Sequence, residues 1–433
     1  MSRSDIRRLA FALTAVVLAV TAASCGVSRQ APVQLADNRP HRLSDERPLR
    51  VAGAEPFRDM VQLDIVIDPD GTVRSARPIG GFEPAFAAAR AEAEGWRYEP
   101  VLRNRQMVAA RFEDRVIVVP ADRPIARHVP FPEILDPSSV RIGFAQRGTC
   151  FAPCLTYSVE IAADGIVSFD GEVDTIIAGR HTATVSPGAV SALVDLFRNS
   201  DFFSFDDKDF PWMGADLPSS TLWISFDGRT KSFEDRSRPD VPAQIATLQA
   251  AVIRTSGADK WILGTDETVD LLRAGGVDLR SSSAAAVVAG AMAQYRSDFL
   301  RSLLAAGSPL DGPKGMPGSY ALVIAASRDD RDATAVAEAA AARGTSSDKA
   351  AALVIAARLG DIELLRRLLS GGADPNAGNA EGTRPLDVVY SEDAALQLLD
   401  AGARSAPSHR GSTTLRDQAR EAGWIRVLAK LGR

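Results

Sequence analysis

Histidine and cysteine are scarce in this chain, with four histidines and three cysteines among 433 residues. The histidines stand singly, so none has a partner at zinc-ligand spacing such as H-E-x-x-H. A G-x-S-x-G nucleophile elbow and a Walker phosphate loop are missing as well. We therefore predict a protein that is not an enzyme and that uses no metal ion and no cofactor.

An excess of positive charge is also lacking. The formal net charge is -5 and the pI is near 5.6. Because phosphate contacts need a basic face, we predict no nucleic-acid partner. The apolar share of 45% and the charged share of 24% are ordinary for globular proteins. At about 100 to 200 residues per domain, the length predicts several domains.

Long apolar runs are rare, and the clearest one covers residues 9–24. It follows Arg7 and Arg8 and leads through small residues to Cys25. These sixteen residues fall short of the ~20 that a membrane-spanning helix needs. The pattern predicts a secretory signal that is removed before Cys25.

The run from Ala22 to Cys25 resembles the bacterial lipobox. This resemblance implies that residues 1–24 are a lipoprotein signal peptide and that Cys25 is lipidated. In bacterial lipoproteins an aspartate after the lipidated cysteine signals retention in the inner membrane. This chain has Gly26 at that position, so the resemblance implies delivery to the outer membrane, with the protein facing the periplasm. The membrane contact is then the lipid anchor.

Proline and composition mark the domain boundaries. Residues 25–50 are polar, contain spaced prolines and predict a lipidated tether. Five further prolines mark a linker over residues 120–137. Asp-Gly pairs between β-rich runs indicate hairpins up to about residue 260, and helical periodicity takes over from residue 261.

The segment 51–119 predicts a small α+β domain. Leu63, Ile65 and Ile67 alternate with other residues before the turn from Asp68 to Gly71, as in a β-hairpin. An alanine-rich helix pattern then covers residues 82–94, and the motif Trp96-Arg97-Tyr98-Glu99-Pro100 leads to a predicted strand pair over residues 108–119.

These features resemble the C-terminal domain of the TonB energy-transducer family. The sequence departs from that family at Asn104-Arg105-Gln106-Met107, where a Gly-x-Pro-Val turn is usual. The resemblance implies a small sheet whose edge strand can pair with an extended peptide.

Residues 138–260 predict a second α+β domain, with strands, Asp-Gly turns and two helices near 186–200 and 242–254. Cys150 and Cys154 lie in this segment. In an oxidising compartment they are candidates for a disulfide, and the chain between them must then turn. The sequence leaves three interpretations of this cysteine pair open: a structural disulfide, two unreactive thiols and a redox-active pair.

The residues from Cys150 to Tyr157 are similar to an uncharacterised envelope domain with the core C-x-G-x-C-P-x-Y. Ala152 and Leu155 replace the glycine and the proline of that core. The family has no assigned activity, so this resemblance implies a fold and no chemistry.

The segment 261–433 contains internal repeats. Helical Leu/Ala-rich runs end at glycines 275, 307, 344, 372 and 402, at spacings that bracket the 33-residue ankyrin period. The runs from Gly372 to Asn376 and from Gly382 to Leu386 resemble the ankyrin consensus. The resemblance implies a solenoid that binds proteins on its concave surface.

The predicted fold class is therefore multi-domain: two small α+β domains followed by an all-α ankyrin-repeat solenoid. The leading functional hypothesis is a lipid-anchored periplasmic scaffold that binds protein partners through the repeats and through an edge strand. The first alternative is an accessory role in TonB-dependent uptake. The second is a redox or hydrolytic enzyme in the middle domain.

Overall fold

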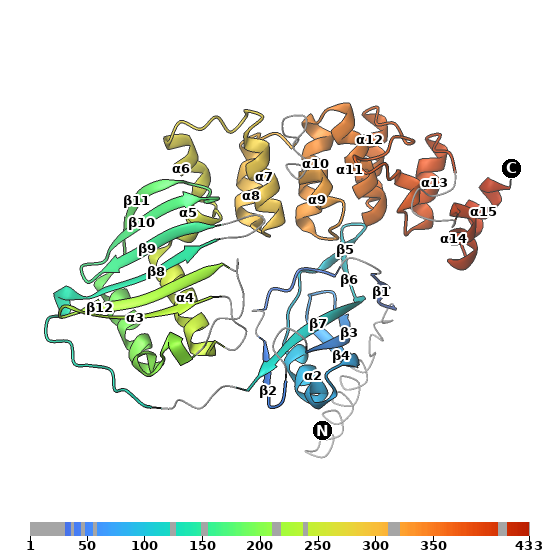
Figure 1. The fold of residues 1–433 in the computed structure, drawn as a ribbon. Helices are drawn as coiled ribbons and strands as arrows, with labels where there is room; N and C mark the ends of the chain where they lie inside the picture. The colour runs from blue at the N-terminus through green and yellow to red at the C-terminus, as the bar shows by residue number, and fades with distance from the viewer. Residues whose placement is uncertain are drawn as a thin grey trace, which may run out of the picture.

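The computed structural model describes residues 31–35, 39–44, 48–54, 59–121, 127–148, 155–209, 218–236, 241–310, 321–405 and 414–432. Strands dominate the N-terminal half of the chain, and helices make up the C-terminal half (Figure 1). The predicted signal peptide and the three cysteines, Cys25, Cys150 and Cys154, lie outside the described residues. In the described ranges, no helix combines the length and apolar character that a membrane crossing requires.

The first domain is built on a sheet whose centre is antiparallel. Its strands β3 (Met60–Ile67), β4 (Val73–Gly81) and β7 (Ala110–Pro120) lie in the order β7-β3-β4. The alternating side chains of Leu63, Ile65 and Ile67 are fully buried, as predicted. Helix α2 (Phe86–Glu94) contacts β3 and β4 and buries Ala89 and Ala93.

The turn between β3 and β4 requires a glycine. Gly71 has φ of +83°, and a Cβ atom there would lie 2.0 Å from the carbonyl oxygen of Tyr98. The close approach lets the amide of Tyr98 donate to the carbonyl oxygen of Gly71 at 2.9 Å. The Asp-Gly turn therefore joins the first hairpin to the Trp96–Pro100 segment.

The end of this domain differs from the prediction. The strand pair predicted over residues 108–119 is wrong, because β7 is one continuous strand that pairs with β3 from Ala110 to Ile117. A separate two-stranded hairpin precedes it, formed by β5 (Val101–Arg103) and β6 (Gln106–Val108).

Part of the predicted tether also belongs to this sheet. Strands β1 (Val33–Gln34) and β2 (Leu49–Val51) both pair in parallel with β7. They satisfy backbone groups on the edge of β7 that β3 leaves open, and Leu35 enters the core. The polar composition of this stretch concealed these two short pairings.

The second domain has a six-stranded antiparallel sheet in the order β11-β10-β9-β8-β12-β13. Helices α3 (Pro187–Asn199) and α4 (Ala243–Ser256) confirm both predicted helices, and α4 contacts β8, β9 and β12. Ser186 caps α3 by accepting from the amide of Ala189 at 3.2 Å. The strands are β8 (Arg141–Arg147), β9 (Thr156–Ala162), β10 (Ile166–Val173), β11 (Gly179–Thr184), β12 (Ser219–Phe226) and β13 (Arg229–Asp235).

After the short helix α5 (Asp259–Ile262), the C-terminal helices lie side by side in successive pairs (Figure 1). One hydrophobic core runs through them from Val269 to Val427. The repeat glycines are expected to end their helices in a left-handed turn, and Gly307, Gly372 and Gly402 do so at positive φ. The expectation is wrong at Gly275, which has φ −76° and leaves the positive φ to Gly276, and at Gly344, which is extended at φ −72° and leads directly into the next helix. The helices are α6 (Thr268–Ala274), α7 (Ala284–Ala293), α8 (Ser297–Ala305), α9 (Ala321–Ala325), α10 (Arg331–Arg343), α11 (Ser346–Leu359), α12 (Ile362–Ser370), α13 (Glu392–Asp400), α14 (Leu415–Glu421) and α15 (Ile425–Leu431).

Candidate protein-interaction surface

Two short connections between paired helices lie on the side of the helical array that faces β5 (Figure 1). Residues 326–330 join α9 to α10, and Gly360 and Asp361 join α11 to α12. Each connection ends in an aspartate that caps the next helix. Asp330 accepts from the amide of Ala333, and Asp361 accepts from the amide of Leu364, both at 2.9 Å. These caps hold both connections in place.

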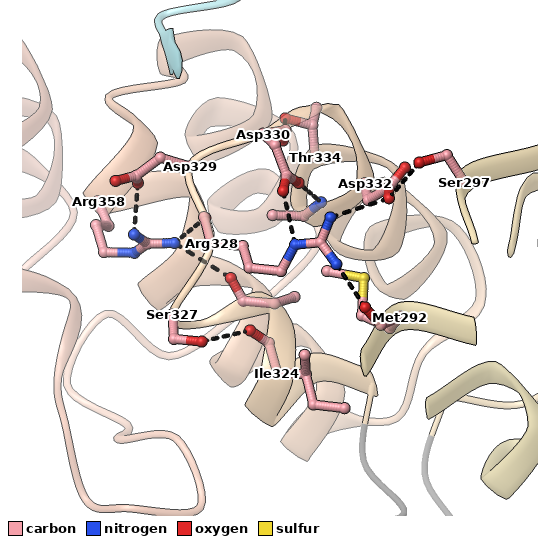
Figure 2. Close-up of polar contacts among 12 residues, drawn as sticks. Met292, Ser297, Ile324, Ser327, Arg328, Asp329, Asp330, Asp332, Thr334 and Arg358 are labelled. Atoms are coloured by element: carbon pink, nitrogen blue, oxygen red, sulfur yellow. Dashed lines mark hydrogen bonds and ion pairs between the residues drawn. The ribbon is translucent and has the colours of Figure 1, made fainter. Parts of the chain in front are cut away.

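Arg328 ties the first connection to the neighbouring helix pair. Its buried guanidinium donates to Asp330 at 2.6 Å and to Asp332 at 3.1 Å (Figure 2). It also donates to the carbonyl oxygen of Met292, at the end of α7, at 2.5 Å. The side chain therefore joins α7 to the start of α10 and lies over the Tyr295 ring, 4.0 Å from its centroid.

Arg358 links the two connections to each other. From the end of α11 it pairs with Asp329 and donates to the backbone carbonyls of Ala325 and Arg328 (Figure 2). The carbonyl of Ala325, the last residue of α9, also accepts from the amide of Arg328 at 3.1 Å, so the buried arginine adds a second donor at the end of this helix. We call Arg328, Arg358, Asp329, Asp330 and Asp332 the arginine–aspartate network.

Burial changes proton affinity within this network. It raises the pKa of Asp332, and the neighbouring Asp330 raises it further, while hydrogen bonding from Ser297 and the charge of Arg328 oppose the rise. Burial likewise lowers the pKa of Arg358, and Asp329 acts in the opposite direction. Buried charges of this kind depend on their partners, so the network is sensitive to the loss of any one member.

The β5–β6 hairpin of the first domain contacts both connections. The amide of Leu102 donates to the carbonyl oxygen of Asp329, and the amide of Asn104 donates to that of Leu359, each at 2.8 Å. Leu102 lies in β5, and Asn104 lies in the turn that follows it. The repeats therefore accept main-chain hydrogen bonds from the strand and from the turn of this hairpin.

Two arginines of the hairpin add ion pairs. Arg103 lies 3.1 Å from Asp329, whose side chain is 7% exposed. Arg105 lies 2.9 Å from Asp361, whose side chain is 2% exposed, and 2.8 Å from Glu338 on α10. The charge-assisted hydrogen bond to Asp361 is the main cause of a raised pKa at Arg105. The hairpin thus presents cations to carboxylates of the repeats.

The first domain meets the repeats at a second place. His41 stacks on Tyr295 with 3.6 Å between ring centroids and 11° between ring planes. A cavity of about 210 Å³ lies beside this contact, lined by His41, Glu99, Tyr295 and Asp330, among other residues. Burial is the main cause of a raised pKa at Glu99, and Asp330 and Asp332 add to it.

The sequence-based candidate residues do not form this surface. Cys25, Cys150 and Cys154 lie outside the described residues, so their lipidation and pairing stay predictions. Among the residues that the structure describes, no cluster of histidine, cysteine or carboxylate side chains could hold a metal ion. Arg103 and Arg105 were not among the predicted site residues, although the departure at residues 104–107 marked this turn as unusual.

Comparisons with known proteins bear on two parts of the chain. Residues 143–256 match a family described as a domain of unknown function, DUF6438. This is consistent with the predicted uncharacterised middle domain, and it adds no activity.

The chain is also similar to the mouse (Mus musculus) cyclin-dependent kinase 4 inhibitor B, with 42% identity over 94 residues. That match covers 21% of this chain and 70% of the mouse protein. The rat (Rattus norvegicus) protein of the same name is 40% identical over 95 residues, which cover 21% of this chain and 72% of the relative. Both relatives are ankyrin-repeat proteins, and the repeated helix pairs after residue 261 are the part of this chain with that pattern. The chain therefore belongs to the ankyrin-repeat proteins.

Proposed function

We propose that this chain is a protein-binding scaffold of the bacterial cell envelope. In this proposal its C-terminal helices form an ankyrin solenoid that holds protein partners, and lipid on Cys25 attaches it to the outer membrane, facing the periplasm. It acts by binding and not by catalysis.

One observation carries the binding role: the repeats already hold a polypeptide segment. The β5–β6 hairpin contacts them through two main-chain hydrogen bonds and through ion pairs to Asp329, Glu338 and Asp361. Main-chain hydrogen bonds provide affinity for many sequences, and side-chain contacts provide selectivity. A surface with both kinds of contact suits a protein ligand.

The anchor is supported by the signal pattern before Cys25. Several acyl chains on one cysteine hold a protein on a bilayer where a single chain binds only marginally. We expect Cys25→Ser to release the protein from the membrane fraction, while Cys150→Ser leaves it there. Equal membrane retention of both variants would rule out the anchor.

Crosslinking and affinity purification from membranes test the scaffold role. Full-length protein is compared with a version ending at Gly264, before α6. A partner captured only by the full-length protein supports binding through the repeats. The same partners in both samples would move the function to the two N-terminal domains.

An accessory role in TonB-dependent uptake is the second candidate, and the first sheet supports it. Among the described residues, no strand pairs with the outer edge of β4, so an extended peptide could add to the sheet there. A strain lacking residues 63–112 should then lose receptor-dependent transport. Unchanged transport in that strain contradicts this role.

A further inference from the structure

The tip of the β5–β6 hairpin has a backbone conformation that arginine rarely adopts. Asn104 and Arg105 form the two-residue turn, with φ of +46° and +63°. Hairpin turns with two left-handed residues favour Asn-Gly, because glycine has no Cβ atom to clash. Glycine at position 105 would form this turn with less strain, so the turn itself does not account for the arginine.

The contacts of Arg105 account for it. Its Nε atom lies 2.9 Å from Asp361 and its Nη2 atom lies 2.8 Å from Glu338, on two different helix pairs of the repeats. A strained residue whose side chain makes the contact between domains is a mark of a binding element. Arg103, two residues earlier, pairs with Asp329 in the same way.

The receiving surface is held by its own helices. Asp361 caps α12 through the amide of Leu364, and Asp329 is paired with Arg358. The accepting carbonyls belong to Asp329 and Leu359, beside the same connections. Since helix caps and the buried arginine position these acceptors, the surface is organised for a ligand that carries two arginines on a tight turn.

Covalent connection helps the hairpin to occupy this surface. The side chains of Arg105 and Glu338 are 43% and 38% exposed, so this ion pair contributes little affinity, whereas the carboxylates of Asp361 and Asp329 are buried and their pairs contribute more. Segments joined in one chain meet at an effective concentration of roughly millimolar. A partner with the same turn and additional contacts can therefore compete with the resident hairpin.

We propose that the surface formed by the α9–α10 and α11–α12 connections is a receptor for an Arg-X-Arg β-turn, occupied in the resting chain by residues 101–108 and opened to a protein partner that carries such a turn. This inference rests on the protein-binding role of the repeats and is independent of the membrane anchor.

The test measures binding of a fluorescent peptide that spans residues 99–110, closed by a disulfide between added terminal cysteines. It is titrated into the full-length wild-type chain and into full-length Arg105→Gly. Glycine suits the turn, so the hairpin should still form while losing its ion pairs with Asp361 and Glu338. We expect the variant to bind the peptide at least about ten-fold more tightly than the wild type, because its own hairpin competes less well. Equal affinity for both chains would overturn the proposal.

Two controls separate specific recognition of the arginine turn from a general loosening of the contact between the first domain and the repeats. A peptide with alanine at both arginine positions should not bind Arg105→Gly, and equal binding of both peptides would overturn the proposal. The chain variant Asp361→Asn keeps a side chain able to cap α12 but loses the charge, so it should bind the arginine peptide weakly. Tight binding there would contradict the assigned receptor. If the peptide binds the wild type and Arg105→Gly equally while the repeats still capture a partner from membranes, this inference is wrong and the scaffold role stands.

Discussion

The Nε atom of Arg105 lies 2.9 Å from Oδ2 of Asp361, although the two residues are 256 positions apart in the chain. The same carboxylate caps α12 through the amide of Leu364. Docking of the first domain and the stability of a repeat therefore depend on one side chain, and substitutions at this position can separate the two.

Replacing Asp361 by alanine should destabilise the repeats. The change removes a helix cap, which costs about 0.5–2 kcal/mol, whereas Asp361→Asn should cost less because asparagine is also a good cap. Urea unfolding followed by the helical circular dichroism signal measures both variants. The matched control is Asp298→Ala, whose side chain is 76% exposed. If Asp361→Asn lost as much stability as Asp361→Ala, the charge of Asp361, and not its capping hydrogen bond, would be what stabilises α12.

Arg328→Met should be one of the most damaging substitutions in the helical segment. It leaves the buried carboxylates of Asp330 and Asp332 without this partner, and breaking such a pair typically costs about 3–5 kcal/mol. Arg301→Met, which removes an exposed pair with Asp298, should stay within about 0.5 kcal/mol of the wild type. Thermal unfolding of both variants provides the comparison, and similar losses would show that the network contributes little.

Docking of the first domain should strengthen as the pH falls from neutral. Burial, followed by the charges of Asp330 and Asp332, raises the pKa of Glu99 above its usual value of 4.5, while Arg328 and Arg331 oppose this rise. Undocking relieves the burial, so the docked state binds the proton more tightly. The gain in docking stability therefore develops as the pH falls through the raised pKa of Glu99 toward 4.5, and it is lost as the pH rises through that pKa.

Hydrogen exchange of residues 101–108 between pH 7 and pH 5, corrected for intrinsic rates, measures this effect. Glu99→Gln should dock more firmly at pH 7 and should lose the pH dependence. If hydrogen exchange in Glu99→Gln kept the pH dependence of the wild type, another titratable group would be the cause of the effect.

Tyr98→Phe should weaken the core of the first domain. The Tyr98 hydroxyl donates to Asp114 Oδ2 at 2.7 Å, and both groups are buried. Removing this donor from a buried carboxylate costs about 1–3 kcal/mol. Faster hydrogen exchange of the amides in β3 and β7 should report the loss. Tyr390→Phe is the control, since Tyr390 is 54% exposed, and equal effects would contradict the assigned hydrogen bond.

Local patterns in the sequence determined much of the secondary structure. The alternation at Leu63, Ile65 and Ile67 predicted a strand with one buried face, and Ser186 predicted the start of α3. The glycines at 372 and 402 predicted the ends of α12 and α13. These features depend on interactions within a few residues, so the order of neighbouring residues is enough to reveal them.

Only the tertiary structure decided how distant segments meet. β12 pairs with β8, whose partner residues lie 72 to 84 positions earlier in the chain, and β1 and β2 join β7 although their stretch is polar and proline-containing. Arg105 could be recognised in the sequence as an odd turn residue, but its partners Asp361 and Glu338 could not. Charged side chains have many possible partners along a chain, and the choice among them follows from which backbone elements packing brings together.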